Sequence, residues 1–69
     1  MEKEILKFIG KNIKKYRKLC GYTQEKLADI ADVHPATIGR LEGGGINVTV
    51  LKLQKISKIL NIEVKDLFQ

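Results

Sequence analysis

Residue types that build metal sites and disulfides are scarce in this chain of 69 residues. A single cysteine, Cys20, excludes an internal disulfide and a zinc site made of several cysteines, and it agrees with a reducing cytoplasm. The single histidine, His34, has no second histidine and no carboxylate at ligand spacing. We therefore expect no metal and no cofactor, and we assign His34 to a helix cap or a phosphate contact.

Membrane segments and catalytic motifs are missing as well. No apolar run approaches the roughly 18 residues of a membrane span, and the lysine-rich start lacks the apolar core and cleavage site of a signal peptide. The adjacent glycines of 43–45 lack the lysine and the serine or threonine of a P-loop. Cys20 and His34 lie on different expected helices with no third group to orient them, so nucleophilic catalysis has little support. The sequence thus predicts a cytoplasmic protein that is not an enzyme and has no evident small-molecule ligand.

What is present is an ordinary globular composition with an excess of basic residues. Hydrophobic residues make up 43% of the chain and charged residues 30%, which is not the composition of a disordered tail. The net charge of +5 indicates an anionic partner, although many basic proteins bind none. Strand-like alternation, repeats and linkers are absent, so we expect an all-α fold and a single domain over residues 1–69.

Residues 23–42 predict two short helices joined by a tight turn. Thr23 is a suitable N-cap, and the apolar residues after it recur at helical spacing, which predicts a helix over about 24–31. A second helix begins at Pro35, because proline suits the first helical turn, and His34 lies near its N-cap. The outer face of this second helix is left with small and polar residues and one long basic side chain: Ala36, Thr37, Gly39 and Arg40.

A basic amphipathic helix is expected before this pair, from about Lys3 to Leu19, where Gly21 would end it. Apolar residues recur at intervals of four, four, three and four, which predicts one inward stripe of Ile5, Ile9, Ile13, Tyr16 and Cys20. Such a helix can also lie on a membrane surface, but a core this small needs the stripe. We therefore expect a solvated basic face with one or two lysines near phosphates.

The second half of the chain predicts a loop and two further helices. Residues 43–48 are too flexible to continue a helix; they either connect the helices or let backbone amides approach a phosphate. Thr49 caps a fourth helix that ends near Asn61, a residue that suits a left-handed stop. The last segment, about 64–68, predicts a short fifth helix. The inward face of the fourth helix is expected to hold Val50, Leu53, Ile56 and Leu60.

The residues of these helices form one extended motif. Thr-Gln-Glu-x-Leu-Ala-x-x-Ala begins at Thr23, Val33 follows in the turn, and Thr-Ile-x-Arg-Leu-Glu begins at Thr37. Ile13-x-x-Tyr-Arg-x-Leu precedes this stretch, and Leu53-x-x-Ile-x-x-x-Leu-Asn-Ile follows it. The whole pattern resembles the helix-turn-helix of the phage repressor and Cro-type family. The resemblance implies a compact five-helix domain of the lambda-repressor type, with the helix-turn-helix in its second and third helices.

The resemblance also implies a function. It implies a sequence-specific transcriptional regulator, a repressor or a controller-type protein, which binds a palindromic operator in double-stranded DNA as a homodimer. The third helix would enter the major groove, where base edges differ in donor and acceptor pattern. The residues that are expected to contact DNA are Gln24, His34, Pro35, Ala36, Thr37, Gly39 and Arg40.

Several of these residues have distinct expected roles. Arg40 is expected to contact a base, most simply guanine through its two acceptors, and Thr37 a base or a phosphate; Ala36 could touch a thymine methyl group. Gln24 matches the family residue that contacts the sugar-phosphate backbone and braces the recognition helix. Gly39 departs from the family pattern, which usually has a larger residue there, and costs about 1 kcal/mol of helix propensity.

Two further sites are structural. The resemblance implies an ion pair between Arg17 and Glu42 that clamps the first helix to the third; the alternative is two unrelated surface charges. The apolar residues Val64, Leu67 and Phe68 of the fifth helix either form a dimer interface or close the core.

Two alternatives to an operator-binding regulator remain at this stage. One is a module such as an antitoxin or antirepressor, which uses the same fold mainly to hold another protein. The other is a fragment of a larger repressor, although Met1 and the finished fifth helix favour a single unit.

Overall fold

The fold is all-helical over residues 2–69, which the computed structural model describes; Met1 lies outside the described residues. The elements are α1 (Glu2–Leu19), α2 (Gln24–Ala31), α3 (Pro35–Gly43), α4 (Val50–Ile59) and a final 3-10 helix, η1 (Val64–Phe68). The expected all-α fold with a helix-turn-helix at α2 and α3 is therefore confirmed, except that the fifth helix is a short 3-10 helix. Within the described range no helix has the length and apolar content needed to cross a bilayer.

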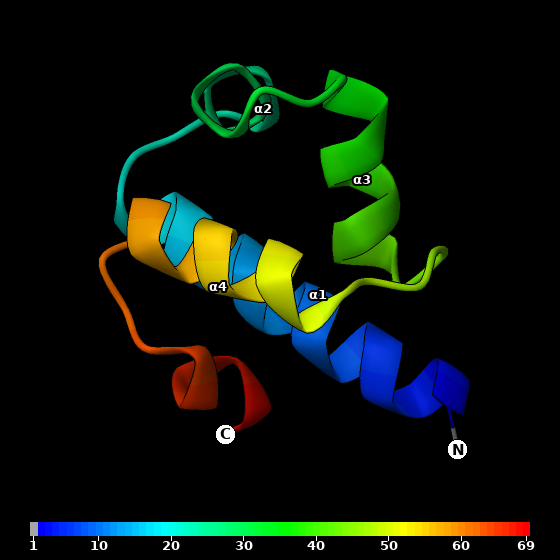
Figure 1. The fold of residues 1–69 in the computed structure, drawn as a ribbon. Helices are drawn as coiled ribbons and strands as arrows, with labels where there is room; N and C mark the ends of the chain where they lie inside the picture. The colour runs from blue at the N-terminus through cyan, green and yellow to red at the C-terminus, as the bar shows by residue number, and fades with distance from the viewer. Residues whose placement is uncertain (1) are drawn as a thin grey trace.

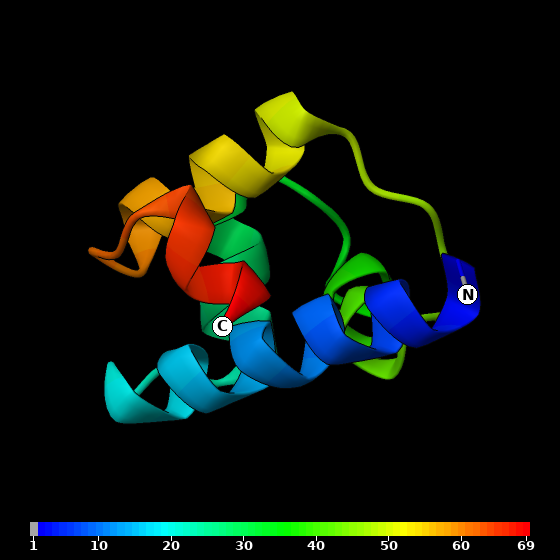
Figure 2. The ribbon, with the colours of Figure 1, turned by 90° about the horizontal axis from the view of Figure 1, so that it is seen from below.

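The helices enclose one core in a molecule of about 30 × 23 × 20 Å. In Figure 1, α4 lies in front of α1 across the middle of the molecule, α2 and α3 lie above them, and η1 lies below. Figure 2 gives the view from below, with η1 between α1 and α4. Each of the five elements supplies one of the largest fully buried side chains: Ile13, Leu27, Ile38, Ile56 and Leu67. Because burial of each such side chain contributes about 1.5–3 kcal/mol, every element is needed for the core.

The helix ends follow the local signals in the sequence. Thr23 Oγ1 accepts a hydrogen bond from Lys26 N at 3.0 Å, and Thr49 Oγ1 accepts one from Lys52 N at 3.1 Å, so both predicted caps are confirmed. The helices stop where the backbone turns left-handed, with φ of +79°, +58°, +72° and +59° at Gly21, Asp32, Gly44 and Asn61.

The buried face of α1 differs from the expected stripe. Ile9 and Ile13 are buried, but Ile5 is half exposed and Cys20 is exposed, so the prediction is wrong at both ends of the stripe. An 18-residue helix is about 27 Å long, and its first turn extends beyond the core toward the lower right of Figure 1. Val50, predicted to face inward, is also exposed, because it lies at the outer edge of the first turn of α4.

The carboxyl-terminal segment is attached to α1 by a buried polar contact. Asn12 Nδ2 donates a hydrogen bond to the Leu67 carbonyl oxygen at 2.8 Å, and Asn12 is buried. Leu67 is fully buried, so it closes the core and does not form a dimer surface, while Val64 is partly exposed and Phe68 is 51% exposed. Of the three residues assigned to a dimer interface, Leu67 therefore requires correction.

The helices α1 and α3 approach each other closely at a glycine. A Cβ atom added to Gly10 would lie 2.2 Å from the Leu41 carbonyl oxygen and 2.6 Å from that of Glu42. No other residue type fits this crossing without moving one of the helices. Gly10 thus sets the distance between α1 and the end of the helix that is expected to contact DNA.

Candidate nucleic-acid interface

The outer face of α3 is a surface of small side chains with one long basic one. Ala36 and Arg40 are exposed, and Thr37 and Gly39 are partly exposed. On the opposite side of the helix, Ile38 and Leu41 are buried in the core. Small side chains let the helix come close to the floor of a groove in a partner. Arg40 projects beyond them and offers five N–H donors.

His34 caps the amino end of α3. Its Nδ1 accepts a hydrogen bond from Ala36 N at 3.0 Å, and Pro35 occupies the first helical turn, as expected. A neutral imidazole that accepts through Nδ1 carries its proton on Nε2. The exposed ring therefore presents a donor at the positive end of the helix, where a phosphate oxygen is favoured.

A buried network joins α1, α2 and α3 directly behind this face. Arg17 Nε donates to Glu42 Oε2 at 2.5 Å and Arg17 Nη2 to Glu42 Oε1 at 3.1 Å, with the two side chains only 8% and 4% exposed. Gln24 Nε2 donates to Glu42 Oε1 at 3.0 Å, and Arg17 Nη1 donates to the Tyr22 carbonyl at 2.8 Å. The ion pair implied by the resemblance is thus present and is bidentate.

Gln24 occupies a bracing position between α2 and α3. Its amide nitrogen is held by Glu42, and its Oε1 would lie 3.9 Å from a Cβ atom added to Gly39, so the side chain reaches across to the outer part of α3. Gln24 is partly exposed at the first residue of α2, next to backbone amides that the helix itself leaves free. The structure therefore brings Arg17, Gln24 and Glu42 together beside Gly39.

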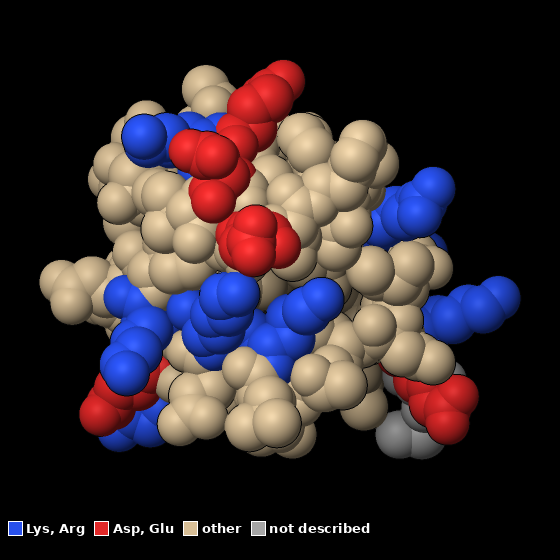
Figure 3. Space-filling model, turned by 45° about the horizontal axis from the view of Figure 1, so that its top comes forward, with Lys and Arg blue, Asp and Glu red and all other residues tan. Residues whose placement is uncertain are grey.

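The charges on the surface are segregated. Glu25, Asp29 and Asp32 are exposed on α2 and its carboxyl-terminal cap, and in Figure 3 acidic side chains gather on the upper part of the face shown. Most of the basic side chains in that view form a band below them or project from the edge. These carboxylates disfavour a polyanion along the outer side of α2, where Lys26 is the one exposed basic residue of the helix.

The expected dimer residues border a larger apolar face. Ile5 and Phe8, both about half exposed, share one side of α1 with Asn12, because they are spaced three and four residues apart. Asn12 contacts η1, whose last residue Phe68 is also half exposed. The apolar face of α1 and η1, defined by Ile5, Phe8 and Phe68, thus lies where η1 packs against α1.

Sequence reasoning missed two supports of this site. Gly10 lies inside a helical pattern, where an isolated glycine indicates a packing constraint; here the constraint is the close approach of the α3 backbone. The Tyr22 carbonyl accepts a hydrogen bond from Arg17, and no sequence pattern predicts this contact, because every residue type has the same backbone oxygen.

Comparison with known proteins relates the whole arrangement to a known family. The profile of the helix-turn-helix family matches residues 13–67. Control protein C.SmaI of Serratia marcescens is 34% identical over 64 residues, which cover 93% of this chain and 76% of that protein.

Two solved structures have the same fold over nearly their whole length. The restriction-modification controller protein C.AhdI from Aeromonas hydrophila superposes with a TM-score of 0.85 at 31% identity, covering 94% of this chain and 97% of that one. SinR, a master regulator for biofilm formation solved in complex with DNA, superposes with a TM-score of 0.80 at 34% identity, covering 88% of this chain and 98% of that one.

Proposed function

This chain belongs to the helix-turn-helix family and is a DNA-binding transcriptional regulator, not an enzyme, and we propose that it binds a palindromic operator as a homodimer. In this proposal α3 enters the major groove of each half-site. Because its partner is the DNA of the cell, the protein acts in the cytoplasm.

The outer face of α3 is the main support for this mode of binding. Small residues at Ala36, Thr37 and Gly39 let the helix approach base edges, and Arg40 is the one side chain long enough to donate two hydrogen bonds to a guanine. Ala36 fits beside a thymine methyl group, and Thr37 can donate to a base or a phosphate. Pro35 and the cap residue His34 enter the groove first, with the ring donor of His34 near one strand.

Gln24 anchors the same helix to the backbone of the DNA. Its side chain is fixed by Glu42, and the free amides at the start of α2 favour a phosphate oxygen. The buried pair of Arg17 and Glu42 holds α1, α2 and α3 in one orientation, so that base contacts and phosphate contacts keep a fixed spacing. Arg17 is 7% exposed, which suits a structural role and not contact with bases.

A homodimer contacts more base pairs of DNA than one domain can. One α3 offers about four base-contacting positions, and two copies related by a twofold axis contact half-sites about one helical turn apart. The apolar face of α1 and η1 supports self-association, because Ile5, Phe8 and Phe68 are each about half exposed around the buried Asn12 and Leu67.

The relatives favour a controller-type or repressor role. C.SmaI is named a control protein, and C.AhdI is a controller of restriction and modification. We extend that role to this chain as part of the proposal: the dimer would regulate a gene by occupying its operator.

Selection of bound sequences from a random duplex pool tests the proposal. The expected result is an enriched palindrome with about ten base pairs between half-site centres, and binding that weakens steeply with salt as counterions are released. An enriched sequence without twofold symmetry would contradict the dimer. A pool without any enriched sequence would contradict specific recognition and would favour a role in holding another protein.

A further inference from the structure

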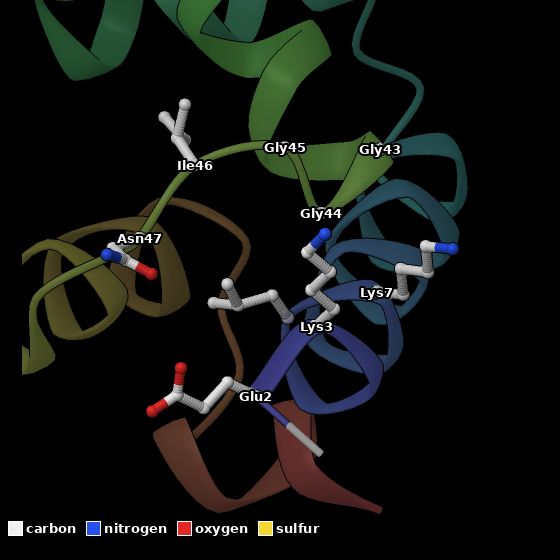
Figure 4. A pocket seen from close by; sticks show the side chains of 9 residues that line it. Glu2, Lys3, Lys7, Gly43, Gly44, Gly45, Ile46 and Asn47 are labelled. Carbon is white, nitrogen blue, oxygen red and sulfur yellow. The ribbon is translucent and has the colours of Figure 1, made fainter.

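An open hollow lies where the first turns of α1 pass the loop that follows α3. It has a volume of about 560 Å³, and Figure 4 shows it from close by. One wall comes from the start of α1 and the other from residues 43–47; the lining includes Lys3 and Lys7. The hollow begins at Gly43, the last residue of the helix that contacts DNA in the proposed function.

Glycine brings the loop into direct contact with α1. Gly44 has a φ of +72°, and a Cβ atom added to it would lie 2.8 Å from the backbone N and Cα of Lys7. The backbone of the loop therefore runs against the backbone of α1 and against Cγ of Lys7. In Figure 4 the Lys3 ammonium group is directed toward Gly44.

The positive charges at the hollow come from α1 and not from the loop. Residues 43–49 contain no lysine or arginine, and the carboxyl end of α3 carries a partial negative charge that disfavours a phosphate. Lys3 and Lys7 are both exposed and lie four residues apart on α1, and within residues 2–69 neither forms an ion pair. Figure 4 shows the Lys7 side chain directed outward, away from residues 44–47. The Glu2 carboxylate also lines the hollow, but Figure 4 shows it directed toward Asn47, away from the Lys3 ammonium group.

The position of the hollow relative to α3 identifies the anion. A helix of about 10 Å diameter fills the major groove, which is about 12 Å wide, so its end passes close to a phosphate backbone. We infer that Lys3 and Lys7, with the loop of residues 43–47, form a phosphate clamp for the DNA strand that passes the carboxyl end of α3. The clamp rests on the proposed function and supplies from α1 the positive charge that the loop lacks.

The salt dependence of binding by the full chain tests the clamp. The variant Lys3→Gln/Lys7→Gln is compared with the parent protein on the selected operator and on a random-sequence duplex. Each phosphate contact that is lost should reduce the slope of log K against log salt by about 0.9 and weaken binding about 10-fold near 0.1 M salt. Because phosphates carry no sequence information, affinity for the operator and for random duplex should fall by the same factor.

The matched control is Lys55→Gln/Lys58→Gln, which removes the same charge from exposed positions of α4. It should change the slope by much less than the Lys3 and Lys7 variant, and both variants should retain the parent melting temperature. Equal changes in slope for the two variants would attribute the effect to net charge and overturn the clamp. An unchanged slope for Lys3→Gln/Lys7→Gln would overturn it as well, while leaving operator binding by the parent intact; a parent that binds no duplex would refute the proposed function and the clamp together.

Discussion

Arg40 is the residue whose side chain distinguishes base recognition from phosphate binding. The Arg40→Ala variant should lose discrimination at one base pair by about 1–3 kcal/mol, because a bidentate contact to guanine is lost, and it should keep its fold, because Arg40 is exposed. Affinities for the operator and for single-base variants of it give the measurement.

Arg40→Lys provides the matched control. Lysine keeps the charge but has no planar fork, so this variant should retain more non-specific affinity than Arg40→Ala while also losing guanine preference. Equal losses on every sequence for Arg40→Ala would identify Arg40 as a phosphate contact.

Glu42 accepts three hydrogen bonds in the buried network. Its removal is expected to lower the stability of the fold more than it changes the DNA sequence preference. Its removal leaves the buried Arg17 guanidinium without its carboxylate, which should cost about 3–5 kcal/mol. For a domain of this size, Glu42→Ala should lower the melting temperature by more than about 10 °C. Thermal unfolding followed by circular dichroism measures the change.

A surface pair serves as the comparison for Glu42. Lys65 and Glu63 form a salt bridge with both side chains more than two-thirds exposed, and Lys65→Ala should leave the melting temperature nearly unchanged. If Glu42→Ala unfolded at the parent temperature too, the network would not clamp the helices.

Single residues were predictable from the sequence where their role is local. The caps Thr23 and Thr49 and the left-handed stop at Asn61 depend only on neighbouring backbone groups, so residue type was enough to find them. Asn12 could not be found in this way, because its partner is a carbonyl 55 residues away. The pair of Arg17 and Glu42 came from the family resemblance, not from the spacing of charges.

At the scale of helices, Gly10 of α1 and Gly39 of α3 should respond to alanine in opposite directions. Gly10→Ala should destabilise the protein by about 1–3 kcal/mol, because its Cβ would lie 2.2 Å from a backbone oxygen of α3 and the helices must separate. Gly39→Ala should stabilise it by up to about 1 kcal/mol, because the new Cβ meets only Gln24 Oε1 at 3.9 Å and helix propensity improves.

Urea unfolding of the two variants measures both effects on one scale. A Gly10→Ala variant as stable as the parent would mean that the crossing of α1 and α3 is adjustable. In that case the distance between α1 and the end of α3 would not be set by Gly10.

The helices were predictable as segments but not as packed surfaces. Turn residues and apolar spacing gave their ends within one or two residues. The face of α1 was predicted incorrectly at Ile5 and Cys20, because periodicity shows which residues share a side and not how far the partner helices extend. The last segment is a 3-10 helix because five residues are enough for one short turn that buries Leu67.

At the scale of the whole molecule, the apolar face of α1 and η1 determines the expected oligomeric state. Phe68→Ala should raise the dimer dissociation constant by about 30-fold, corresponding to about 2 kcal/mol for the loss of an aromatic side chain from the interface. Sedimentation equilibrium gives the constant.

Leu19→Ala is the control for Phe68→Ala. Leu19 is also apolar and is more exposed than Phe68, and it lies at the carboxyl end of α1, away from Ile5 and Phe8. It should leave self-association unchanged. A dimer that survives Phe68→Ala unaltered would require an interface on another part of the surface.

The hydrogen bond between Asn12 and Leu67 also bears on the order in which the core can be completed during synthesis. The ribosome makes α1, α2 and α3 first, but the core needs Leu67, the last of the five large buried side chains. Until residue 67 has emerged, Asn12 lacks its carbonyl partner and the apolar sides of the earlier helices have no complete cover. The helix that meets DNA in the proposed function is therefore made before Leu67, the side chain that completes the core behind it.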